Sequence, residues 1–152
     1  MRIEARLADM GVALPEVLVP AANYVPYVQI GDIVYVSGQI SAGSDGPICG
    51  KLGENLSVKD GCVAARACAL HLLAQVKAAC GGDLDKLMRV IKLTGFVHST
   101  SDFIDQPKVI NGASDFLVEV LGDAGRHARS AVSTVGLPFG VAVEIEGIFQ
   151  VA

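Results

Sequence analysis

The spacing of apolar residues changes along the chain, and each change predicts a structural element. Near the N-terminus, three apolar residues recur at helical spacing within residues 3–10, which predicts a short amphipathic helix. Residues 27–30 and 33–37 are rich in valine, isoleucine and tyrosine, and they predict two strands. Gly31-Asp32 lies between them and suits a two-residue hairpin turn with glycine first. The first half of the chain therefore starts with a helix followed by a β-hairpin.

A long apolar stripe at helical spacing follows the hairpin. It runs from residue 58 to residue 80, and Ser57 with Asp60 resembles a capping box in which aspartate replaces glutamate. Gly81-Gly82 suits the end of this helix. The residues before it, 41–55, are rich in glycine and predict a loop.

The second half of the chain alternates strands with one more helix. Residues 87–98 are largely apolar and predict a long, mostly buried strand. A second helix is expected over 106–121, where Gly122 stops it, and two strands are expected over 129–135 and 141–151. The order ββαβαββ favours an α+β fold, a mixed sheet with both helices packed on one face.

The last strand indicates which of its faces is buried. Apolar residues and one glycine occupy alternate positions from Val141 to Val151, and this set should lie beneath the helices. The opposite face carries Glu144 and Glu146 together with Ile148. That face is expected to be solvent-exposed or to line an interface.

Composition indicates one soluble domain with more apolar residues than its own core requires. The chain has 152 residues, 51% of them hydrophobic and 18% charged, and its mean hydropathy is +0.48. One domain is expected at this length, and no long uncharged apolar run indicates a transmembrane helix. We therefore expect the apolar surplus to be buried between subunits.

Charge and cysteine usage argue against several classes of function. The formal net charge is −4, and the basic residues are scattered without interleaved aromatic residues, so nucleic-acid binding is not expected. The four cysteines form no Cys-x-x-Cys pair and the three histidines lack metal-ligand spacing, so no metal is expected. These features, with a charged N-terminus unlike a signal peptide, predict reduced thiols in a cytoplasmic protein.

The candidate chemistry lies in the last 26 residues. Arg129 opens a β-type run, and a guanidinium presents a planar fork that matches a carboxylate, which lysine does not. Glu144 and Glu146 follow in the next run; two close carboxylates repel each other and can raise one pKa, which suits proton transfer. A salt-bridged Arg129, a solvated Glu146 and a structural Glu144 are the alternatives that the residues leave open.

Several motifs occur in an order typical of one family. They are Pro26-Tyr27-Val28-Gln29, Ser37-Gly38-Gln39-Ile40, Asn111, Ala128-Arg129-Ser130, Leu137-Pro138 and Val143-Glu144-Ile145-Glu146. Over about residues 24–152 the chain resembles the Rid family of reactive intermediate deaminases, also called the YjgF or "endoribonuclease L-PSP" family. The resemblance implies a single domain over 1–152 with an N-terminal extension over 1–23, and a chorismate-mutase-like fold. It also implies a homotrimer whose three sheets form a central barrel, with active sites in clefts between subunits.

The resemblance also implies a reaction and a set of site residues. The reaction is hydrolysis of small reactive enamines or imines of 2-oxo acids to the 2-oxo acid and ammonia, without a cofactor. Arg129 would hold the substrate carboxylate, and Glu146 would position or activate the attacking water. The residues implied to line or shape the substrate pocket are Tyr27, Ser37, Gly38, Asn111 and Ala131.

Some positions depart from the family pattern. His127 stands where many members have proline, and Ala131 stands where many deaminases have cysteine, which removes a thiol from the pocket. Two alternatives therefore stay open beside the deaminase. One is a trimer that binds a small carboxylate or metabolite without turnover; the other is an endoribonuclease, which the acidic isoelectric point of about 5.2 disfavours.

Overall fold

The structure is a computed structural model that describes residues 2–18, 20 and 22–152. Its helices are α1 (Ile3–Asp9), α2 (Val58–Ala79) and α3 (Gln106–Leu121), with the 3-10 turns η1 (Leu84–Lys86), η2 (Gly122–Gly125) and η3 (Pro138–Gly140). Its strands are β1 (Tyr27–Ile30), β2 (Ile33–Ile40), β3 (Ala42–Gly43), β4 (Gly46–Pro47), β5 (Leu87–His98), β6 (Ala128–Thr134) and β7 (Val143–Val151).

Local signals set the ends of the two long helices. The predicted capping box of α2 is confirmed: Ser57 Oγ accepts from the Asp60 amide at 3.1 Å, and the Asp60 carboxylate accepts from the Ser57 amide at 2.9 Å. The end of α3 is also as predicted, because Gly122 adopts a positive φ of 64° that most residues avoid. These signals fix the helices that cover the sheet.

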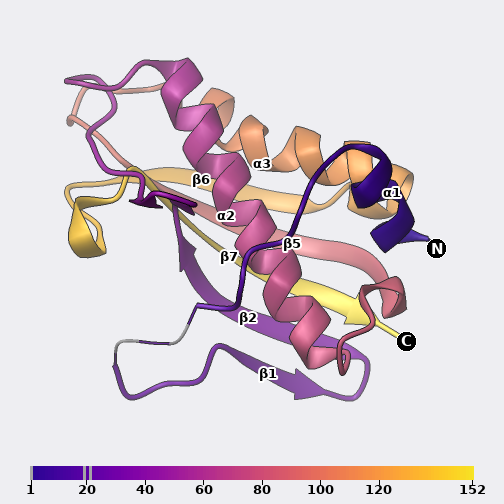
Figure 1. The fold of residues 1–152 in the computed structure, drawn as a ribbon. Helices are drawn as coiled ribbons and strands as arrows, with labels where there is room; N and C mark the ends of the chain where they lie inside the picture. Colours follow the sequence, from indigo (N-terminus) through magenta and orange to yellow (C-terminus); the bar gives the residue numbers. More distant parts are fainter. Residues whose placement is uncertain (1, 19, 21) are drawn as a thin grey trace.

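The main sheet has the strand order β1-β2-β7-β5-β6. Its neighbours are antiparallel except for β5 and β6, which run parallel, as a mixed sheet requires. Helices α2 and α3 lie together on one face, and none of the described residues forms a helix over the other face (Figure 1). The predicted α+β, chorismate-mutase-like architecture with both helices on one face is therefore confirmed.

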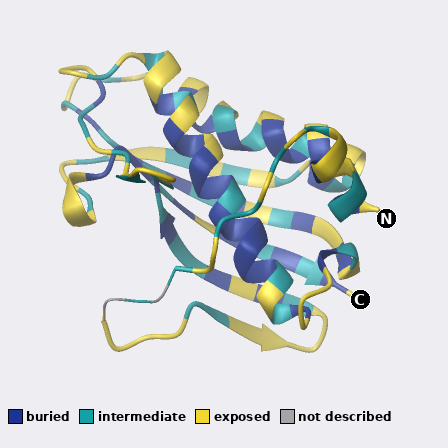
Figure 2. Cartoon of the chain, in the orientation of Figure 1, coloured by how far each residue is buried: buried dark blue, intermediate teal, exposed yellow. Residues whose placement is uncertain are grey.

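The core lies between the helices and the covered sheet face. On β7, Val143, Ile145 and Phe149 are fully buried beneath the helices, as the alternation predicted. Burying a side chain of this size stabilises the fold by about 1.5–3 kcal/mol. Ile3 and Leu7 of α1 belong to the same core, so the first helix packs on the domain; Figure 2 shows α2 largely buried and β1 largely exposed.

Helix α2 (Val58–Ala79) is long and apolar enough to cross a membrane by length and composition alone. In the fold, however, most of the helix is buried against the sheet and α3. Its composition is that of a core helix, and it gives no indication of a membrane span.

Three details differ from the sequence predictions. The glycine-rich loop contains a small hairpin, β3–β4, because its glycines permit a tight turn. Strand β5 alternates between buried and half-buried residues from Leu93 on, and Met88, Arg89 and Lys92 are exposed, because helices cover only one face of the sheet. All four cysteines are free, as predicted, but only Cys68 and Cys80 are buried; Cys49 is exposed and Cys62 is half-buried.

Candidate active site

Arg129 is positioned by the edge strand β6 and by helix α3. Its strand partner is Leu93, which is buried beneath the helices, so Arg129 lies on the helix-covered face of the sheet. The guanidinium Nη1 donates to Asn111 Oδ1 at 2.8 Å and to Ser114 Oγ at 3.1 Å. Both acceptors lie on α3 at i and i+3, and they therefore share one face of that helix.

A short polar chain behind Arg129 holds Ser114 in place. His127 Nδ1 lies 2.6 Å from the carbonyl oxygen of Gly125, and a carbonyl only accepts, so Nδ1 carries the proton. His127 Nε2 is then the acceptor for the Ser114 hydroxyl at 2.9 Å. Burial lowers the pKa of His127 and the charge of Arg129 lowers it further, against the opposing bond to Gly125. A neutral His127 keeps the Ser114 oxygen free to accept from Arg129.

These contacts leave one edge of the Arg129 guanidinium available. Nη1 uses both of its hydrogens, whereas Nη2 makes only a long contact of 3.5 Å with the Pro107 carbonyl. The Nε–Nη2 edge is the pair of parallel donors that binds a carboxylate bidentately. Arg129 lines a pocket of about 230 Å³, called here the arginine pocket. The lining residues are Ser114, Asp115, Val118, Arg126, His127 and Arg129.

A second, larger hollow lies between the N-terminal segment, β2 and η3. This apolar cavity has a volume of about 440 Å³, which is within the range of small-molecule sites. Its lining residues are Leu18, Pro20, Ala22, Tyr24, Pro26, Gly38, Gln39, Ile40, Pro138, Phe139 and Glu144. One carboxyl group, that of Glu144, therefore lies in a mainly apolar wall.

Glu144 packs directly over Gly38. A Cβ atom built on Gly38 would lie 2.5 Å from Glu144 Oε2, so only glycine admits the carboxylate at this place. Glu144 is half-buried; burial raises its pKa, and the nearby charge of Glu146 raises it further. A carboxyl group with a raised pKa accepts a proton more readily than an ordinary one near neutral pH.

The structure separates Glu146 from both hollows. Glu146 is exposed and lines neither of them. Its strand partner is Thr94, next to Leu93 along β5, so Glu146 and Glu144 share the uncovered sheet face. Arg129 lies on the opposite face, so one protomer does not bring the guanidinium to either glutamate.

The other predicted site residues lie in several places. Gly38 lines the apolar cavity, and Asn111 is a partner of Arg129. Ala131 is half-buried and follows Arg129 by two residues on the same face of β6. Ser37 Oγ donates to the Val25 carbonyl at 2.7 Å, which fastens the preceding segment to β2. Tyr27 packs against the core and does not line the cavity.

The sequence analysis did not identify two residues and one segment that line the two hollows. Ser114 could have been found, because it lies one helical turn after Asn111. Phe139 adopts a φ of +59°, rare for an aromatic residue, and nothing in its sequence indicates that it lines a cavity. The N-terminal strap, defined as Leu18, Pro20, Ala22, Tyr24 and Pro26, gave no periodic signal.

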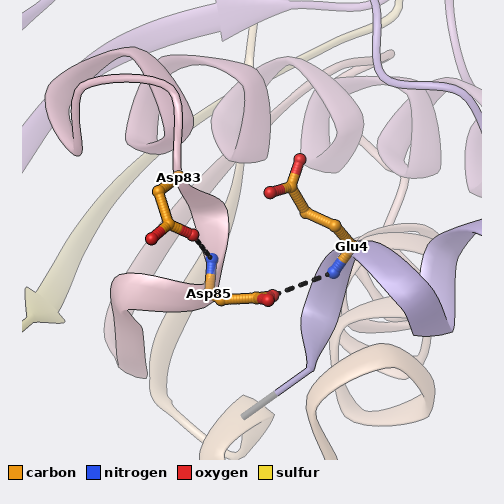
Figure 3. Close-up of side chains that lie close together, drawn as sticks. All are labelled: Glu4, Asp83 and Asp85. Atoms are coloured by element: carbon orange, nitrogen blue, oxygen red, sulfur yellow. Dashed lines mark hydrogen bonds between the residues drawn. The ribbon is translucent and has the colours of Figure 1, made fainter.

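Three acidic residues also converge where α1 meets η1 (Figure 3). Their carboxylates have protein partners: Asp85 accepts from the Glu4 amide at 3.1 Å, and Asp83 accepts from the Asp85 amide at 3.0 Å. Glu4 forms an ion pair with Lys77 of α2. The cluster therefore attaches α1 to the domain, and we assign it a structural role.

Comparison with known proteins places the chain in a family. The family model described as "YjgF/chorismate_mutase-like, putative endoribonuclease" matches residues 4–144. The chain belongs to the YjgF family. Protein TCP17 of Trypanosoma cruzi is 46% identical over 151 residues, covering 98% of this chain and 94% of that protein.

Two solved structures resemble this one over nearly its whole length. The protein Atu1372 of Agrobacterium tumefaciens, described as of unknown function, is 47% identical with a TM-score of 0.90, covering 99% of this chain and 94% of that one. A "putative endoribonuclease" of Shewanella oneidensis MR-1 is 33% identical with a TM-score of 0.92, covering 98% and 99%. The predicted resemblance to the Rid or YjgF family is thus confirmed.

Proposed function

We propose that this YjgF-family protein hydrolyses small 2-imino acids, and their enamine tautomers, to 2-oxo acids and ammonia. The observation that carries the proposal is the arrangement of Arg129. One edge of its guanidinium is occupied by Asn111 and Ser114, and the other edge is available as a carboxylate fork. A half-buried His127, whose Nε2 accepts from the Ser114 hydroxyl, supports that orientation.

The active site is completed by a neighbouring protomer. Within one chain, β2 and β6 are three strand spacings apart, about 14 Å, and Arg129 lies on the opposite sheet face from Glu144. A small substrate cannot contact both Arg129 and Glu144 of one protomer. We propose a homotrimer in which the arginine pocket of one protomer faces the apolar cavity of the next. Its interfaces would cover exposed apolar residues of the open sheet face, such as Tyr35 and Val132.

The proposed reaction uses positioning and one proton acceptor. Arg129 binds the substrate carboxylate and fixes the C=N carbon next to the neighbour's Glu144. Glu144 accepts a proton from water while the water oxygen bonds to that carbon, and it passes this proton to the imine nitrogen. The resulting carbinolamine loses ammonia as the C–N bond breaks and the C=O bond forms, with the hydroxyl proton passing through Glu144 to the departing nitrogen. The raised pKa of Glu144 favours this role over Glu146, which acts on the pKa of its neighbour.

The remaining predicted residues support the same site. Asn111 orients Arg129, Ala131 flanks it on β6, and Gly38 provides room for Glu144. Ser37 and Tyr27 hold the segment that forms the cavity wall against the sheet. The reaction requires no cofactor and no metal, and its substrates are cytoplasmic intermediates, so we propose a cytoplasmic enzyme.

The test is ammonia release from freshly generated 2-iminopropionate, with the wild type beside Arg129→Ala. We expect the variant to lose about 100-fold in kcat/KM, because the substrate is no longer aligned. Arg66→Lys is the matched control: Arg66 is exposed on α2, stacks on Phe116 and lines neither hollow, so its substitution should leave the rate unchanged.

Two outcomes would replace the proposal. A well-folded wild type that binds pyruvate but accelerates no imine hydrolysis would be a carboxylate-binding protein. Cleavage of RNA by the wild type, retained in Arg129→Ala, would instead indicate the endoribonuclease that the family description names.

A further inference from the structure

We propose that the apolar cavity binds the side chain of the substrate and selects imino acids with a large apolar side chain, branched or aromatic. The inference rests on the proposed deaminase function and names its substrate class. It comes from the composition of the cavity wall, from the way the N-terminal strap is fixed, and from the position of Phe139.

The wall of the cavity offers few polar contacts. Gln39 is buried, and its amide is already engaged, with Nε2 donating to the Ser37 carbonyl at 2.9 Å and Oε1 accepting from Gln75 at 3.4 Å. Glu144 and the hydroxyl of Tyr24 are the other polar side-chain groups among the lining residues. A polar side chain placed there would lose hydration without gaining partners, whereas an apolar side chain would gain contact area.

Charge decides which end of the substrate enters the cavity. The substrate carboxylate would be repelled by Glu144, whereas Arg129 attracts it. The carboxylate therefore binds in the arginine pocket, the C=N carbon lies near Glu144, and the side chain extends into the cavity. The cavity volume of about 440 Å³ leaves ample room beyond a methyl group.

The N-terminal strap is held at both of its ends. Gln75 Nε2 on α2 donates to the Leu18 carbonyl at 3.0 Å. At the other end, Ser37 donates from its hydroxyl to the Val25 carbonyl at 2.7 Å and from its amide to the Pro26 carbonyl at 2.9 Å. All five strap residues are uncharged and mainly apolar, so the folded chain holds them ready for an apolar ligand.

Phe139 forms the opposite wall. It lies in η3 with a φ of +59°, and its side chain is 71% exposed although it is a large aromatic group. The backbone around it is held by bonds from Gly50 to Gly140 at 3.1 Å and from Cys49 Sγ to the Phe139 carbonyl at 3.4 Å. An exposed ring held at the edge of an apolar cavity would be covered by an apolar ligand.

The test compares 2-imino-4-methylpentanoate with 2-iminopropionate as substrates of the wild type and of Phe139→Gly. Glycine accepts the positive φ, so this variant removes the ring and keeps the turn. We expect the wild type to prefer the larger imine by about 10-fold or more in kcat/KM, and the variant to lose most of that preference. The control is Val63→Ala on the exposed face of α2, which should keep the preference.

A binding measurement separates this inference from the proposed function. Calorimetry with the stable products, 4-methyl-2-oxopentanoate and pyruvate, reports the cavity without turnover. Tighter binding of the larger acid that is lost in Phe139→Gly supports the cavity assignment even when neither imine is hydrolysed, an outcome that would refute the deaminase alone. Turnover of both imines at equal rates, or equal binding of both acids, would overturn the substrate class and leave the deaminase standing.

Discussion

At the scale of residues, two glutamates on one face of β7 have different surroundings. Glu144 lies over Gly38 in the apolar cavity, whereas Glu146 is exposed two residues later. Strand alternation predicts that Glu144 and Glu146 share one face of the strand, and their sequence neighbours are similar. What separates them is the close approach of β2 at Gly38, a contact between strands far apart in sequence, so the sequence alone does not distinguish their environments.

The two glutamates should respond differently to neutralisation. Glu144→Gln should reduce kcat/KM by about 100-fold, because it removes the proton acceptor. Glu146→Gln should keep most of the activity but lower the pKa of Glu144, because one cause of the raised pKa is the charge of Glu146. The ionised base then persists to lower pH, and the acidic limb of the kcat/KM profile should move to lower pH.

A pH-rate series on the two variants measures both effects. An unchanged acidic limb in Glu146→Gln, or full activity in Glu144→Gln, would assign the proton acceptor to another group.

At the scale of elements, α2 and α3 approach each other closely through a glycine. A Cβ atom on Gly112 of α3 would lie 2.1 Å from the Cys62 carbonyl oxygen of α2, and that atom belongs to a helix backbone. The arginine pocket depends on this packing, because Asn111 and Ser114 flank Gly112 on the same helix.

Gly112→Ala should therefore destabilise the fold by about 3 kcal/mol, because neither helix can move without disturbing the core. Gly136→Ala is the matched control, since a Cβ there meets nothing within 4 Å and the residue does not have a positive φ; its free energy of unfolding should change by less than about 1 kcal/mol. Urea denaturation of both variants checks the prediction, and equal stabilities would contradict the helix contact.

Most elements were predictable because local signals mark them. The apolar stripe and the Ser57 cap define α2, and alternating apolar residues define β7. The small β3–β4 hairpin was missed because two-residue strands carry too few side chains to show a period. The strap was missed because contacts of its two ends with α2 and β2 hold it, and no pattern of its own marks it.

At the scale of the whole molecule, the fold contains histidines that resist protonation. His71 is buried; its Nε2 lies 3.1 Å from the Ala42 carbonyl, and its Nδ1 has no partner within the part of the chain that the structure describes. Burial lowers its pKa below the ordinary value of 6.5, against the opposing bond to Ala42. The pKa of His127 is lowered as well, also mainly by burial.

Stability should therefore decrease on acidification. Below about pH 6.5 the unfolded chain binds protons that the folded chain resists, so stability present above that pH is lost as the pH falls through the lowered pKa values. Urea denaturation at pH 7.5 and at pH 5.5 gives the free energy of unfolding at each pH. Between the two, this free energy should fall less for His71→Gln than for the wild type. An equal fall in the two proteins would exclude His71 as a cause of the acid sensitivity.

The arginine pocket and the apolar cavity lie apart within one protomer, and only the whole molecule shows why. Sequence alternation predicts two faces for each strand, but it does not say which face of β6 matches which face of β7. The parallel register of Arg129 with Leu93 decides this, and it places Arg129 opposite to both glutamates. The two halves of the predicted site are thus separated within a protomer. Its completion by a neighbour, which the family resemblance implies, is the central claim.

Subunit complementation tests that claim most directly. Arg129→Ala and Glu144→Gln should each be inactive alone as trimers of the 15.8 kDa chain. Co-expressed with different tags and purified as mixed trimers, they should regain about a third of the wild-type rate of ammonia release, because each mixed trimer pairs an intact arginine with an intact neighbouring glutamate at one of its three interfaces. Mixed trimers as inactive as the parent variants would contradict a shared site.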